Sequence, residues 1–129
     1  MNILSLDHLV LTVRSIEDTV RFYTTILGMQ ARTFGNGRIA LHFGAQKINL
    51  HQADRPVDEN VRHATPGSAD ICLLTDTPLE EVIEELKTKG IHIIEGPGRR
   101  TGARSALQSV YFYDPDENLV EVANELPNP

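Results

Sequence analysis

The chain of 129 residues repeats its own pattern at a fixed offset. The segment 5–15 returns as 67–77, and each copy is followed by an amphipathic helical stretch that ends at a glycine. These glycines are Gly28 and Gly90, which are 62 residues apart (90 − 28 = 62), the same offset that separates the two segments (67 − 5 = 62). A duplicated unit of this size predicts two similar modules that were joined in tandem.

Polar residues fall at matched positions of the two copies. The 62-residue offset relates His8 to Asp70, and the strands that close the two halves pair Asn49 with Glu121. Because ligand-binding side chains recur at equivalent points of predicted strands, a ligand site on the pseudo-twofold axis is the first hypothesis for function.

Hydrophobic periodicity gives each half the order strand, helix, strand, strand, strand. We therefore predict an α+β fold of two tandem βαβββ modules in one domain, 1–129, with module one at 1–52, a linker at 53–68 and module two at 69–124. The expected strands are 7–13, 30–34, 38–43 and 47–51 in the first half. In the second half they are the copy of the first strand within 67–77, then 91–95, 107–113 and a last strand through Asn124.

Both predicted helices begin with capping signals. Ser15 has Asp18 three residues later, as in a capping box. Thr77 is followed by Pro78, a residue favoured in the first helical position, and by Glu80. We therefore expect Ser15 and Thr77 to be the two N-caps.

Composition excludes several classes of protein. A net charge of −6 argues against nucleic acid as a partner, because a phosphate-binding surface needs clustered Lys and Arg. No apolar run approaches the length of about 18 residues that a membrane span requires. The single Cys72 and the absence of a recognisable leader suit a reducing compartment, so we expect a cytoplasmic protein.

Three arginines gather in the glycine-bounded segment 98–104, which we expect to be a loop. Arg100 and Arg104 could bind an anionic group of a small substrate by bidentate hydrogen bonds. The alternative is a solvated loop whose charges only aid solubility. Tyr111 is first a packing residue, and its hydroxyl reaches a substrate if it points inward.

Several motifs together resemble the vicinal oxygen chelate superfamily, which includes glyoxalase I, extradiol dioxygenases and bleomycin-binding proteins. The motifs are the opening segment 7–13, the helix ending Leu27-Gly28-Met29 and the closing segment 114–121. The segments 43–51 and 100–103 are most similar to small glyoxalase-domain proteins, some of them linked to bacterial virulence. The resemblance implies modules that curl into an open curved barrel, a divalent metal on the inner surface and a homodimer.

The resemblance also implies metal ligands. His8 matches the first ligand of the family, and Glu121 matches the carboxylate that serves as ligand and, in several members, as base. Asp70 stands where many members have a histidine, and Asn49 stands where glyoxalase I has a glutamate. His51 shares a strand face with Asn49 and could supply the missing imidazole. The implied set is thus His8, His51 and Glu121, with Asp70 as a possible further ligand.

A site of imidazole and carboxylate ligands suits Ni, Zn, Mn, Fe(II) or Co. Three functions then fit the sequence. The first is a metal-dependent lyase or isomerase of glyoxalase type that acts on a small vicinal-oxygen substrate. The second is an Fe(II) extradiol-type dioxygenase with His8, His51 and Glu121 as its facial triad. The third is a metal-free protein that binds a small antibiotic or toxin.

Overall fold

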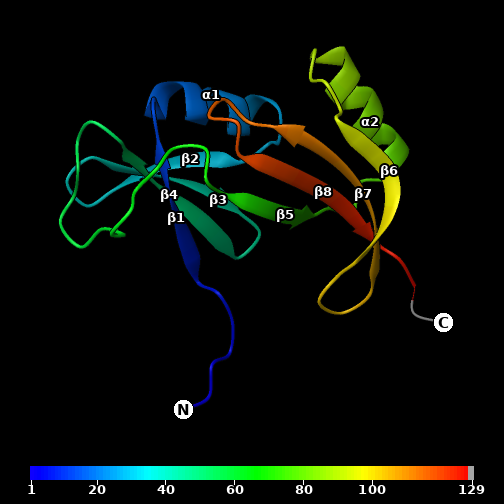
Figure 1. Cartoon of the computed structure of the whole chain (residues 1–129), viewed down its shortest axis with the longest axis horizontal. Coiled ribbons are helices and arrows are strands. Elements are labelled where there is room, and N and C mark those ends of the chain that lie inside the picture. Colours follow the sequence, from blue (N-terminus) through cyan, green and yellow to red (C-terminus); the bar gives the residue numbers. More distant parts are fainter. Residues whose placement is uncertain (128–129) are drawn as a thin grey trace. The chain divides into compact units, whose positions relative to one another are not determined.

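The computed structural model describes residues 1–127 and divides the chain into two compact units, Met1–Gly67 and a second that starts at Ser68. The first unit contains β1 (His8–Val13), α1 (Ile16–Thr25), β2 (Gln30–Phe34), β3 (Arg38–Phe43) and β4 (Gln46–Gln52). The second contains β5 (Asp70–Leu74), α2 (Leu79–Thr88), β6 (Glu95–Thr101), β7 (Ala106–Tyr113) and β8 (Leu119–Glu125) (Figure 1).

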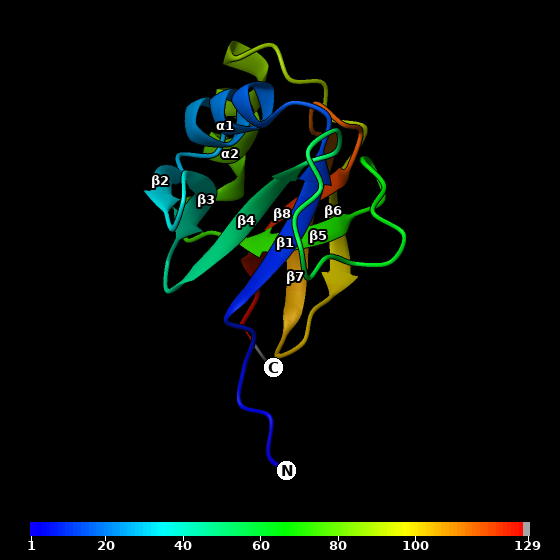
Figure 2. The same cartoon turned by 90° about the vertical axis from the view of Figure 1, so that its left-hand side faces the viewer.

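The two units have the same topology. Each has one four-stranded sheet, with the strand order β1-β4-β3-β2 in the first unit and β5-β8-β7-β6 in the second. The first and last strands of each unit pair in parallel, as β1 and β4 do side by side in Figure 2, and the other pairs are antiparallel. The predicted α+β fold of two βαβββ modules is therefore confirmed. The sheets are curved, as β6 and β7 show in Figure 1, and within the described residues neither sheet closes into a barrel.

Each sheet has an apolar face that packs against its helix and an opposite face, here called the open face. In the first unit the apolar face buries Leu11, Leu41 and Ile48, and Tyr23 of α1 is fully buried. In the second unit Leu86 of α2 and Val122 of β8 belong to the corresponding core. Since successive side chains of a strand point to opposite faces, this packing leaves the intervening polar residues on the open faces.

The helices begin as the duplication predicts, with one difference. Ser15 is the N-cap of α1 and its Oγ accepts a hydrogen bond from the Asp18 amide at 3.1 Å, as expected. The N-cap of α2 is Pro78 rather than Thr77, and no side chain at that position provides a cap. The prediction of Thr77 was wrong because a distant residue, Asn124, supplies the capping acceptor.

A side chain from the last strand of each unit holds the start of its helix. Asn124 Oδ1 accepts a hydrogen bond from the Leu79 amide at 2.8 Å, and its Nδ2 donates to the carbonyls of Thr75 at 3.0 Å and Thr77 at 2.9 Å. Gln52 Oε1 accepts from the Ile16 amide at 3.3 Å in the first unit. Gln52 and Asn124 are 72 residues apart (124 − 52 = 72), as Asn49 and Glu121 are (121 − 49 = 72), so this contact is part of the duplication.

One further prediction was wrong. The expected strand 91–95 lies instead at Glu95–Thr101, so the arginines at 99 and 100 belong to β6 rather than to a flexible loop. The segment 53–68, expected to be a linker, contains no helix or strand, and its residues up to Gly67 cluster with the first compact unit. No helix within residues 1–127 is long and apolar enough to cross a membrane.

Candidate functional site

His8 begins β1 on the open face of the first sheet. Its Nδ1 lies 2.8 Å from Asp7 Oδ1, and this hydrogen bond, together with the charge of His8, lowers the pKa of Asp7. A carboxylate at Nδ1 favours the tautomer with its proton there, which leaves the Nε2 lone pair available. This is the arrangement that outer carboxylates impose on metal-binding histidines.

His51 has a different environment, although it lies on the same open face. It is buried, Arg38 donates to its Nε2 at 3.3 Å, and Asn60 Oδ1 lies 3.3 Å from its Nδ1. Because a guanidinium can only donate, Nε2 is the acceptor and Nδ1 carries the proton that Asn60 accepts. Both ring nitrogens are therefore engaged.

The strand register also separates the two histidines. His8 pairs with Lys47, whereas His51 pairs with Thr12, four residues further along β1. Four residues of parallel strand span roughly 13 Å. The first unit thus places His8 and His51 on one face but does not bring their rings together.

Asn49 lies near the centre of the same face, between Val10 of β1 and Ala40 of β3. It is only 5% exposed, and its Oδ1 has no hydrogen-bond partner among the described residues. A buried acceptor without a donor costs about 1–3 kcal/mol, so such atoms are rare and a binding or catalytic role is one reason for them. Asn49 was not among the residues predicted to bind a ligand, because it stands where glyoxalase I has a glutamate. The signal that singles it out is its match to Glu121 in the repeat.

Glu121 occupies the middle of the open face of the second sheet. It lies in one row with Cys72 of β5 and Tyr111 of β7. Ser109 Oγ donates to Glu121 Oε2 at 2.6 Å, which fixes one carboxylate oxygen. A half-buried carboxylate that is held at one oxygen can bind a cation or accept a proton at the other.

The neighbours of Glu121 keep their own protons. Burial, then the charge of Glu121, raises the pKa of Cys72 to about 11. The pKa of Tyr111 is also raised, first by burial and then by its hydrogen bond to Glu121, while Arg100 opposes the shift. At neutral pH both groups are therefore hydrogen-bond donors, and Cys72 is not a thiolate nucleophile.

The two arginines expected to bind substrate have different surroundings. Arg100 lies over the Tyr111 ring, 5.2 Å from its centroid, and 3.9 Å from a carboxylate oxygen of Glu95. Arg104 makes two hydrogen bonds to Glu125, at 3.1 and 2.7 Å. This exposed ion pair lowers the pKa of Glu125 and raises that of Arg104.

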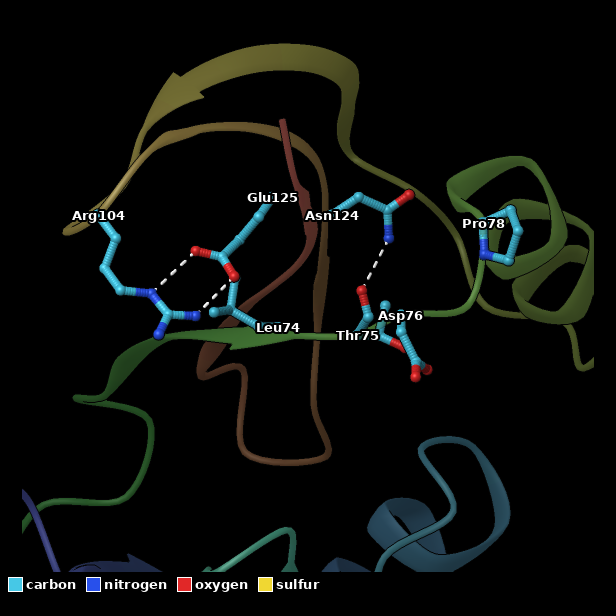
Figure 3. Close-up of a pocket in the computed structure, with 7 residues that line it drawn as sticks. All are labelled: Leu74, Thr75, Asp76, Pro78, Arg104, Asn124 and Glu125. Carbon is cyan, nitrogen blue, oxygen red and sulfur yellow. Dashed lines mark hydrogen bonds and ion pairs between the residues drawn. The ribbon is translucent and has the colours of Figure 1, made fainter. Parts of the chain in front are cut away.

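Arg104 and Glu125 also line a pocket of about 780 Å³ in the second unit (Figure 3). Asn124 of β8 and Pro78 at the start of α2 also line it, as does Asp76, which is exposed. The pocket therefore lies beside the helix-capping contact of Asn124, and its only arginine is already neutralised by Glu125.

Asp70 begins β5 on the face that carries Cys72, two residues from the Glu121 row, and is exposed. Within residues 1–127, no three His, Cys, Asp and Glu side chains gather into a group that could hold a metal ion. The candidate donors are instead spread along the open faces, with His8 and His51 in the first unit and Asp70 and Glu121 in the second.

Comparison with known proteins agrees with this fold. The chain is 51% identical over 118 residues to virulence protein STM3117 of Salmonella typhimurium, covering 92% of this chain and 82% of the relative. The crystal structure of that protein has a TM-score of 0.96 at 49% identity, over 98% of this chain and 100% of the other. The glyoxalase domain-containing protein RDO1 of Mycosarcoma maydis is 42% identical over 124 residues, covering 96% of this chain and 70% of the relative.

More distant structures share the fold. Lactoylglutathione lyase from Agrobacterium tumefaciens has a TM-score of 0.72 at 20% identity, over 93% of this chain and 92% of the other. A family model described as the Glyoxalase/Bleomycin resistance protein/Dioxygenase superfamily matches residues 5–122. The match spans both βαβββ units, and the resemblance found in the sequence motifs is confirmed. The chain belongs to the glyoxalase/bleomycin resistance protein/dioxygenase superfamily.

Proposed function

We propose that the chain is a metal-dependent lyase or isomerase of glyoxalase type that acts on a small substrate with two adjacent oxygens. The observation that carries this proposal is the contact between His8 and Asp7, which leaves an imidazole lone pair on the open face. His8 and Glu121 are the proposed metal ligands, and Asp70 is a possible further ligand. An imidazole with carboxylates is a donor set that fits Ni, Zn, Mn, Fe(II) or Co.

A divalent ion bound there would polarise the substrate oxygens and stabilise negative charge beside a carbonyl. Glu121 is the proposed base: Ser109 holds one of its oxygens, and a proton taken up by the carboxylate would compete with the hydrogen bond between Tyr111 and Glu121. Tyr111, which keeps its own proton, is the proposed donor to a substrate oxygen. Arg100 is a proposed contact for the remainder of the substrate. Arg104 could contact the substrate only after its ion pair with Glu125 breaks.

The dioxygenase alternative is less well supported. It requires His51 in a facial triad with His8 and Glu121, but the Nε2 lone pair of His51 accepts from Arg38. Ligation by His51 would therefore require Arg38 to move away. The lyase proposal does not require His51 as a ligand.

Calorimetric titration of the EDTA-treated protein with Ni, Zn, Mn and anaerobic Fe(II) tests the ligand set. We expect His8→Ala and Glu121→Ala to abolish measurable binding. Asp7→Ala should weaken it about 10–100-fold, because an outer carboxylate orients the ligand. His92→Ala, the same substitution at an exposed histidine, is the control and should have no effect. Equal, weak binding by all these proteins would contradict the proposal and favour a metal-free binding protein.

Reaction class and assembly have separate tests. A lyase or isomerase should exchange the proton beside the carbonyl of an α-ketoaldehyde–thiol adduct for solvent deuterium, measured by proton NMR. Glu121→Gln should lose this exchange. We also propose a homodimer, since pairing covers exposed strand edges, and a concentration-independent monomer mass in solution would contradict it.

A further inference from the structure

The four strands of the first unit carry positive charge and no negative charge. Their sequences contain Arg32, Arg38 and Lys47 and three histidines, but neither Asp nor Glu. The strand register places all six of these side chains on the open face, while the opposite face is apolar apart from Thr33 and two glutamines. The chain as a whole has a net charge of −6, so this face is a local concentration of positive charge in an acidic protein.

The cations are held in place without being neutralised. Lys47 Nζ lies 4.0 Å from the centroid of the Phe34 ring, and the Arg38 guanidinium lies 4.9 Å from it. Arg38 also donates to the neutral His51 ring. Cation–π contacts and a neutral acceptor orient a cation but leave its charge available to an anion.

No carboxylate takes up these charges within the described part of the chain. No ion pair within 4 Å joins Arg32, Arg38 or Lys47 to an Asp or Glu side chain. Asp7, whose pKa Lys47 lowers slightly, is hydrogen-bonded to His8. By contrast, Arg100 has Glu95 beside it and Arg104 is paired with Glu125.

A second, independent feature lies on the same face. Asn49 is the neighbour of Lys47 and His51 along β4 and is 5% exposed, and its Oδ1 has no donor among the described residues. The strand on either side contributes only Val10 and Ala40. An acceptor so placed gains free energy when a ligand supplies a hydrogen-bond donor.

We propose that the open face of the first sheet binds a small organic anion that also carries a hydroxyl group. Arg38 and Lys47, positioned on Phe34, bind the oxyanion, and Asn49 Oδ1 accepts the hydrogen bond of the hydroxyl. The ligand class is thus a hydroxylated carboxylate or a similar oxyanion. This rests on the proposed function, since it names the class of substrate that the same enzyme takes.

The test uses the full-length, EDTA-treated protein and NMR titration of its backbone amides with three related probes. L-lactate has both groups, propionate has only the carboxylate, and lactamide has only the hydroxyl beside a neutral amide. We expect saturable shifts in the residues of β1, β3 and β4, with lactate binding more tightly than propionate and at least about tenfold more tightly than lactamide. Binding of lactamide as tight as that of lactate, or no saturable shift in these strands with lactate or propionate, would overturn the proposal.

Matched variants assign the residues. Lys47→Gln and Arg38→Gln should each weaken lactate binding about tenfold. Arg21→Gln on α1 changes the net charge equally but removes a cation paired with Glu17 and Asp18, and it should have no effect. Asn49→Leu should abolish the preference for lactate over propionate while leaving propionate binding unchanged. If Lys47→Gln behaves like Arg21→Gln, or if the loss follows Arg100→Gln instead, the face is not the anion site.

Metal is absent from this experiment, so its result is separate from the metal titration. Loss of metal binding in His8→Ala together with retained lactate binding would support both proposals. Lactate binding without any metal binding would overturn the lyase proposal and leave the anion site. Phe34→Leu, which keeps every charge, provides a further check, because loosening the two cations should weaken lactate binding several-fold.

Discussion

Replacing Asn49 by leucine should stabilise the ligand-free protein. Leucine has nearly the same shape as asparagine, and Asn49 makes no side-chain hydrogen bond within residues 1–127 that would be lost. Removing a buried, unpaired acceptor should recover about 1–3 kcal/mol of unfolding free energy. With about 2.1 cal/mol/K of unfolding entropy per residue, and so about 270 cal/mol/K for this chain, the melting temperature should rise by about 4–11 °C.

Asn118 provides the matched control because it is as deeply buried but fully hydrogen-bonded. Its Oδ1 accepts from the Ala69 amide at 2.8 Å, and its Nδ2 donates to Asp114 Oδ2 at 2.9 Å. Asn118→Leu leaves both partners without their bond and should cost about 2–5 kcal/mol.

Urea unfolding in EDTA, followed by far-UV circular dichroism, measures both variants. An unchanged m-value would show that the change lies in stability rather than in compactness. If Asn49→Leu is destabilised as much as Asn118→Leu, then Oδ1 of Asn49 is already satisfied in the free protein. The reasoning that reserves this atom for a ligand would then be refuted.

Three further predictions concern individual side chains. Asn124→Ala removes three hydrogen bonds at the start of α2 and should lower the unfolding free energy by about 2–3 kcal/mol. Gln52→Ala removes one long hydrogen bond and should lower the unfolding free energy by about 1 kcal/mol or less. Denaturant titration of both variants compares the two losses. With a pKa of about 11, only about one in ten thousand Cys72 side chains is a thiolate at pH 7. The reaction of Cys72 with Ellman's reagent should therefore be slow, and it should accelerate in Glu121→Gln. Reaction at the rate of free cysteine would contradict the raised pKa of Cys72. Glu117 has a φ of +67°, a conformation that glycine adopts with less strain. Glu117→Gly should therefore raise the unfolding free energy by about 1 kcal/mol and the melting temperature by a few degrees. A lower melting temperature would show that the Glu117 side chain stabilises the turn.

The sequence alone determined the duplicated βαβββ plan. The 62-residue offset, the alternation of β1 and the glycines that follow each helix are local patterns, and such patterns depend only on backbone sterics and side-chain periodicity. Gly28 and Gly90 both have φ near the left-handed region, at +70° and +75°, as helix-ending glycines should. The family motifs and the Ser15 cap could also be identified from the sequence, because they too are local patterns.

Tertiary structure decided which side chains have partners. The cap of α2 comes from Asn124, 45 residues from Leu79, and no local signal at Thr77 could reveal it. The pairing of β6 with β7, rather than local glycine content, made Arg100 a strand residue. Such pairings depend on which distant strands meet, which propensity does not encode.

Some features of the candidate site could likewise be identified from the sequence, and others only from the structure. The repeat and the motifs were sufficient to select His8 and Glu121, because matched positions in two copies are visible in the sequence. Only the folded chain shows that Arg38 and Asn60 engage both nitrogens of His51, and that Asn49 Oδ1 is buried without a donor from residues 1–127. Hydrogen-bond satisfaction is a property of three-dimensional neighbours, so it distinguishes residues that the strand pattern places on the same face.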